Sequence, residues 1–317
     1  MFNTVLEKFS GVFSRSFIHC CWFPSFTAAI ISLLVYYFPF GYVVPVMTWG
    51  AWSVPKQIFV LVTFLLLITL IAYIVHGVSY YLMRIFEGYW PKWLRQLFQK
   101  RVIKKWKKLC DARRIEAEKG SDRYSSLQAR IYFGYPAEEK FFLPTCFGNI
   151  IRSAEMYPRT IYGLDGVFWW PRLFPLIPEV IQDNLNENLI AMITLIHFSC
   201  LSFFLGVFSF FHFFCQGEFY FGRQTPRGWI AWGIFIALSL FSWLAYKGIM
   251  AKANSYGLLI RSSYDLYRFQ LLSALNFDLP RTPLEEKDIW SNLENWLYNF
   301  NFRSASELEY KAIEKRT

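Results

Sequence analysis

Four apolar runs separated by charged segments set the pattern of the chain. A helix needs about 20 apolar residues to cross the hydrocarbon core of a membrane. The second and third runs reach that length easily, the first is interrupted by Pro24 and Pro39, and the fourth is short but flanked by tryptophans. Tryptophans are enriched where membrane helices meet water. We therefore predict membrane-spanning helices at about 22–44, 58–83, 189–215 and 229–245.

The basic residues are distributed unevenly around these runs. The link between the first two runs holds only Lys56, and the link between the last two holds Arg223 and Arg227. Far more positive charge follows the second run, in the segment MRIFEGYWPKWLRQLFQKRVIKKWKKLCDARR. Segments rich in Lys and Arg beside a span favour the cytoplasmic side. We therefore expect both termini, the central loop and the C-terminal tail to be cytoplasmic.

The predicted fold is all-α, with four transmembrane helices and a helical cytoplasmic module built from the central loop and the tail. At the N-terminus, apolar residues recur at helical spacing from Phe2 to Phe17, which favours an amphipathic helix on the inner membrane face over a short disordered leader. We expect no cleaved signal peptide, because the first long apolar run starts after residue 20 and no small-residue cleavage site follows it. The expected parts are an interfacial helix at 1–21, a first hairpin at 22–83, the cytoplasmic loop at 84–188, a second hairpin at 189–245 and cytoplasmic helices at 246–317.

A basic amphipathic helix is predicted at 92–119, where Pro91 separates it from the second span. Three interpretations stay open: the helix binds anionic phospholipids, it packs its apolar stripe on another subunit, or it only marks the cytoplasmic side. Nucleic-acid binding is not expected, because no recognition fold accompanies the net charge of +10. The basic residues concerned are Lys100, Arg101, Lys104, Lys105, Lys107 and Lys108.

The most distinctive stretch is 143–179, LPTCFGNIIRSAEMYPRTIYGLDGVFWWPRLFPLIPE. Thr145 is expected to cap a helix that ends near Met156, before Pro158. The pattern PT-x-x-GN-x-x-R-x-AE-x-YP, followed by YGLD and WPRL, resembles a family of uncharacterised bacterial multi-pass inner-membrane proteins. The resemblance continues through 256–275, although similar sequences carry Arg in place of Cys146. It implies a shared fold and an inner-membrane location, but no reaction.

Charged residues in this stretch lie among aromatic residues close to the third span, where an unpaired charge is costly. We expect a structural ion-pair network that holds the loop to the membrane interface. A gate, a ligand site or the mouth of an ion pathway is the functional alternative. The expected members are Arg152, Glu155, Asp165 and Arg172 from the loop, with Arg261 and Asp265 from the tail.

Enzyme signatures are not found in the sequence, and no residues show metal-ligand spacing, so we expect no enzyme, no metal and no cofactor. His76, His197 and His212 fall within spans, where an ionisable group is a functional candidate by default. The plainer interpretation is that a histidine there pairs with a serine or a carbonyl. No Asp or Glu falls within a predicted span, which argues against a transporter coupled through a buried carboxylate.

These patterns favour a homo-oligomeric ion channel or pore-forming membrane protein. The alternative is a non-conducting scaffold or anchor that recruits a cytoplasmic protein partner, and a membrane enzyme is the third choice. The channel hypothesis rests on missing catalytic motifs and on a short-loop, long-loop, short-loop topology, which is an analogy at the level of the fold.

Overall fold

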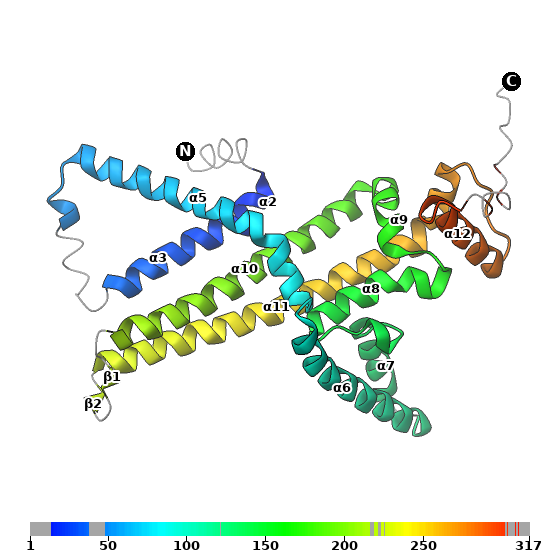
Figure 1. Cartoon of the computed structure of the whole chain (residues 1–317), viewed down its shortest axis with the longest axis horizontal. Coiled ribbons are helices and arrows are strands. Elements are labelled where there is room, and N and C mark those ends of the chain that lie inside the picture. Colours follow the sequence, from blue (N-terminus) through cyan, green and yellow to red (C-terminus); the bar gives the residue numbers. More distant parts are fainter. Residues whose placement is uncertain are drawn as a thin grey trace. The chain divides into compact units, whose positions relative to one another are not determined.

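The computed structural model describes residues 14–37, 48–120, 122–215, 219–220, 223–224, 226–301, 303, 308 and 310 (Figure 1). The predicted N-terminal amphipathic helix lies mostly outside the described residues, as does the end of the first predicted span. The chain divides into two units, Met1–Arg84 with Ile190–Ile249, and Ile85–Leu189 with Met250–Thr317.

Among the described residues, four helices are long and apolar enough to cross a membrane, which confirms the prediction of four long apolar helices in a helical fold. These helices are longer than the apolar runs on which the prediction rests. α10 begins ten residues before its apolar run, and α11 continues far beyond the fourth run. Adding a residue to an existing helix is far easier than starting one, so a helix extends into polar sequence that has no breaker. The four candidate spans are Ile18–Tyr36, Val54–Glu87, Glu179–His212 and Trp232–Ala274.

The first unit contains the apolar parts of the spans. α10 and α11 run antiparallel there (Figure 1), and small residues line their contact. The hydroxyl of Ser199 donates to the carbonyl oxygen of Ser242 at 3.1 Å, and the hydroxyl of Ser242 donates to the carbonyl oxygen of Ser199 at 2.9 Å. Small residues let two helix backbones approach closely, and hydroxyls link them where water is scarce. The elements of this unit are α2 (Arg15–Phe17), the π-helix η1 (Ile18–Trp22), α3 (Phe23–Tyr37), most of α5 (Val54–Glu87), parts of α10 (Glu179–Cys215) and α11 (Pro226–Ala274), and the short strands β1 (Phe219–Tyr220) and β2 (Arg223–Gln224).

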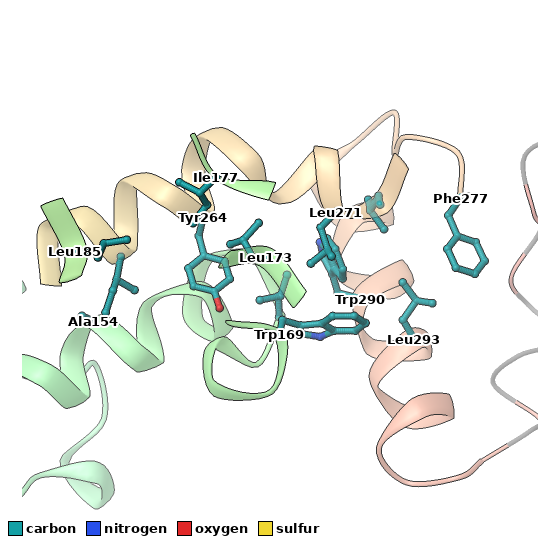
Figure 2. Packing of buried hydrophobic residues seen from close by; sticks show 13 residues of the cluster. Ala154, Trp169, Leu173, Ile177, Leu185, Tyr264, Leu271, Phe277, Trp290 and Leu293 are labelled. Carbon is teal, nitrogen blue, oxygen red and sulfur yellow. The ribbon is translucent and has the colours of Figure 1, made fainter. Parts of the chain in front are cut away.

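The second unit has a hydrophobic core of its own, shown in Figure 2. Trp169 and Trp290 are fully buried with ring centroids 5.2 Å apart in an edge-on arrangement, worth about 0.5–1.5 kcal/mol beyond their burial. The Tyr264 ring is also buried, and its hydroxyl donates to the carbonyl of Gly166 at 2.5 Å. Besides parts of α10 and α11, the elements are α6 (Lys92–Glu118), α7 (Arg123–Gly134), η3 (Glu139–Phe141), α8 (Cys146–Tyr162), α9 (Gly166–Leu173), η4 (Phe174–Leu176) and α12 (Pro283–Leu297).

The predicted end of the motif helix is wrong. α8 does not stop near Met156 but continues to Tyr162, with Pro158 inside it. A proline in a helix removes one hydrogen bond, yet Pro158 is buried, and its carbonyl accepts from the N–H of Leu164 at 3.4 Å. The bond that the proline removes is the one to the carbonyl of Ala154, so the Leu164 bond does not replace it. Burial of the apolar ring offsets the loss, and the Leu164 bond closes the C-terminal end of the helix.

The end of α5 is fastened to the start of α8 by the PT-x-x-GN residues. The Thr145 hydroxyl donates to the carbonyl of Glu87 at 2.9 Å and accepts from the N–H of Gly148 at 3.0 Å, so Thr145 caps α8 as predicted. The Asn149 side chain exchanges hydrogen bonds with both backbone groups of Leu143. A Cβ at position 148 would lie only 1.9 Å from the Glu87 oxygen, so only glycine fits there.

The Gly148→Ala change therefore forces the two backbones apart. We expect it to lower the free energy of unfolding by about 3 kcal/mol, the upper end of ordinary overpacking costs. Thermal unfolding of the full chain in detergent, followed by circular dichroism, measures the loss. Gly134→Ala is the control, because a Cβ there meets nothing within 4 Å. Equal unfolding temperatures for the two variants would show that the close approach does not matter.

Candidate functional site

The YGLDG residues form the turn between α8 and α9. Gly163 ends α8 with a left-handed φ of 77°, a conformation that favours glycine. Asp165 then caps α9, where its Oδ1 accepts from the N–H groups of Val167 and Phe168 at 3.0 and 2.9 Å. Leu164 between them is fully buried. The apolar, proline-rich segment 162–178 is thus a compact turn and short helix that leads into α10.

The four loop charges of the predicted network make separate contacts. Arg152 pairs with Glu155 at 3.2 Å along α8. Asp165 lies 3.5 Å from a guanidinium nitrogen of Arg159, a residue that the sequence argument did not single out. Arg172 instead donates to the carbonyl of Phe168 at 2.8 Å and lies over its ring at 4.2 Å. The cap geometry explains the difference, because it holds Asp165 at the start of α9 while Arg172 lies at the last turn.

Asp265 on α11 is held by two tyrosines of the motif helix. The hydroxyls of Tyr157 and Tyr162 both donate to its Oδ1, at 2.9 and 2.6 Å. Burial, and then the hydrogen bond to the Asp265 carboxylate, raise the pKa of both tyrosines, so both hydroxyls keep their protons as donors. The carboxylate is thus engaged by neutral donors rather than by Arg261.

Arg261 is the most deeply buried of the predicted charges, with 4% of its surface exposed. Its Nη2 donates to the carbonyl of Tyr132 at 3.1 Å and to the hydroxyl of Ser153 at 2.7 Å. The same hydroxyl donates to the carbonyls of Tyr132 and Tyr135, at the C-terminal end of α7. A cation is favoured at the negative end of a helix dipole, so Arg261 completes the end of α7.

A second, partly buried arginine joins α11 to α12. Arg268 lies 2.7 Å from Glu286, whose carboxylate also accepts from the Trp290 indole N–H at 3.4 Å. The Arg268 guanidinium stacks over the Tyr162 ring at 4.0 Å. The prediction did not include the Arg268–Glu286 pair. Arginine, glutamate and tryptophan in two amphipathic helices do indicate that the helices pack against each other. Which helix faces meet could not be predicted from one sequence.

The predicted intramembrane histidine His197 is almost fully buried in the first unit. Pro24 has no N–H, so the carbonyl of Cys20, four residues earlier, lacks its α-helical donor. The His197 Nδ1–H supplies a donor at 2.5 Å, and Nε2 lies 3.1 Å from the hydroxyl of Ser79. His197 therefore pairs with a serine and a backbone carbonyl, which is the plainer of the two interpretations given for the intramembrane histidines. The π-helix η1 holds Cys20 at this interruption.

The other two histidines have different neighbours. His76 Nδ1 lies 3.7 Å from the Cys21 sulfur. His212 stacks on Phe208 and lies near Tyr36. Among the described residues, no group of three or more His, Cys, Asp or Glu side chains could hold a metal ion.

The basic residues of α6 lie on a helix with no buried residue. Lys107 lies 3.5 Å from Glu139, and Arg101 lies over the Phe98 ring at 5.1 Å. Lys105 lines a cavity of about 520 Å³ in the same unit, together with Arg130, Cys146 and a mixture of polar and apolar residues. The remaining three, Lys100, Lys104 and Lys108, border a shallow hollow along the helix.

No match to this chain is found among models of protein families, curated proteins or solved structures. The candidate site is therefore defined by geometry alone. It is the junction of α7, α8 and α11 around Arg261, which also borders a cavity.

Removing the cap of α9 tests the role of the YGLD aspartate. Asp165→Ala should lower the free energy of unfolding by about 1 kcal/mol, the usual cost of a lost N-cap. Asp122→Ala is the matched control, because Asp122 precedes α7 without a side-chain capping bond. Chemical denaturation of both variants measures the difference. A loss at Asp122 as large as that at Asp165 would contradict a capping role.

Glu294 on α12 offers a test of burial by pH. Burial, and then the charge of Asp165, raise its pKa above the ordinary value of about 4.3. A raised folded-state pKa gives stability that is full below the unfolded value and is lost as pH rises through the folded value. Glu294→Gln should therefore raise the unfolding temperature at pH 7, and the gain should shrink toward pH 4. The exposed Asp288→Asn on the same helix is the control, and an equal gain at both pH values for Glu294→Gln would contradict the argument.

Proposed function

We propose that this chain is an integral membrane protein of a bacterial inner membrane, with both termini and the second unit in the cytoplasm. Four helices of sufficient length and apolarity support the membrane part of the proposal. The orientation is supported by the concentration of Lys and Arg in the segment after the second span and in the tail.

Within that membrane, we propose that copies of the chain assemble into a pore that conducts ions. The main supporting observation is how little of each span one chain covers. Only 11% of the apolar windows of α5 and α11 is buried, against 28% and 33% for the other two. Uncovered helix faces are available to lipid and to neighbouring subunits. The apolar runs contain no Asp or Glu, which favours passive conduction over transport coupled through a carboxylate.

A non-conducting scaffold is the second candidate, and a different observation favours it. The second unit has its own hydrophobic core, so its folding does not require that copies of the chain assemble into a pore. Its basic helix α6 leaves Trp93 and Leu97 largely exposed. Exposed aromatic and apolar residues beside basic ones suit a cytoplasmic partner or the surface of anionic phospholipids.

Reconstitution into planar bilayers separates the two functions. If the chain forms a pore, the purified full-length protein should give discrete current steps whose frequency rises with protein concentration. Cross-linking of the same preparation should show a fixed oligomer. Silent bilayers at all voltages and pH values, from protein that is folded and oligomeric, would contradict the pore. Specific retention of one cytoplasmic protein from native membranes would then support the scaffold.

A further inference from the structure

The second unit contains a cavity of about 280 Å³ with two arginines in its wall, Arg113 from α6 and Arg261 from α11. Polar groups of Gln128, Tyr157 and Thr160 also line it. A water molecule occupies about 30 Å³ in the liquid, so the space suits a phosphate or carboxylate group with a small organic body. Most of the remaining wall is aromatic and aliphatic, including Trp106, Tyr132 and Met156, and Ser153 and Cys110 complete it.

Among the described residues, no carboxylate lies within ion-pair distance of Arg261. Burial is the largest influence and lowers the pKa of the Arg261 guanidinium, and the nearby charge of Asp265 offsets only part of this cost. The Arg261 Nη2 has the two bonds to Tyr132 and Ser153, but its Nε is buried and has no hydrogen-bond partner among the described residues. Asp265, one turn further along α11, accepts from two tyrosines and forms no ion pair with Arg261 among the described residues. Burying a charge without a counter-ion in direct contact is costly, even with the dipole of α7 beside it.

Arg113 adds a second positive group to the same wall. One of its guanidinium nitrogens donates to the side-chain oxygen of Gln128 at 2.9 Å, which orients the group between α6 and α7. Arginine is suited to planar or tetrahedral oxyanions, because its parallel N–H groups can donate in pairs. Two guanidinium groups around one cavity thus provide both charge and direction.

We propose that this cavity binds an oxyanion, a phosphate or a carboxylate, between Arg113 and Arg261. The anion supplies a counter-charge in direct contact with the arginines, and the aromatic wall packs on its organic part. The site does not depend on whether the chain forms a pore or a scaffold. The oxyanion is either a soluble metabolite or the headgroup of a lipid.

Arg113 provides the decisive variant, because it does not complete the end of α7 as Arg261 does. Phenyl phosphate and inorganic phosphate are titrated into the full-length protein in detergent, and binding is followed by calorimetry and by the unfolding temperature. We expect saturable binding that weakens about tenfold or more in Arg113→Gln. The matched control is Arg114→Gln, whose side chain is 84% exposed and pairs with Glu118, and it should bind like the unchanged protein.

The source of the anion is distinguished by competition. Displacement of phenyl phosphate by short-chain phosphatidic acid, but not by phosphatidylcholine of the same chain length, assigns the site to a lipid headgroup. Failure of both lipids to displace it assigns the site to a soluble anion, and either result supports an oxyanion site. The proposal is overturned if neither phosphate compound binds saturably. It is also overturned if Arg113→Gln, with an unchanged unfolding temperature in the absence of ligand, binds as tightly as Arg114→Gln.

Discussion

A backbone carbonyl that has lost its helical donor must find another one, and both units of this protein are organised around that constraint. In the first unit, Pro24 deprives the carbonyl of Cys20, and His197 replaces the missing N–H. In the second unit, Thr145 donates to the carbonyl of Glu87 at the end of α5. Ser153 and Arg261 serve the end of α7 in the same way. Each of these side chains lies on a different segment from the carbonyl to which it donates. The hydrogen bonds that satisfy these carbonyls therefore also link helices to one another.

This constraint gives a physical meaning to the motif. Thr145, Gly148 and Asn149 fasten the start of α8 to neighbouring backbone, while Gly163 and Asp165 make the turn into α9. These are residues that a backbone geometry demands, because a cap needs an acceptor, a left-handed position favours glycine and a close approach excludes a Cβ. None of these contacts requires a substrate. The pattern therefore marks a way of folding more directly than it marks a reaction.

The spans could be predicted from the sequence because apolar runs of sufficient length have few alternatives. The cap at Thr145 was also predictable, since threonine after proline and before a helical pattern is a local signal. Helix ends were not, because α8 passes through Pro158 and α11 continues to Ala274 for reasons of packing. The sequence identifies the charged residues of the loop, but their contact partners depend on which helix faces pack together. The pairs Arg159–Asp165 and Arg268–Glu286 therefore could not be predicted from spacing along the chain.

The bond between His197 and the carbonyl of Cys20 has a consequence for how this chain can change over evolution. The need for the imidazole arises from Pro24, through the N–H that proline lacks. A descendant that regained an ordinary residue at position 24 would regain a backbone N–H in the turn that follows Cys20. The Cys20 carbonyl would then no longer require His197, and another residue could replace the histidine. The two positions should therefore vary together across descendants, because a missing backbone donor at one is supplied by the side chain at the other.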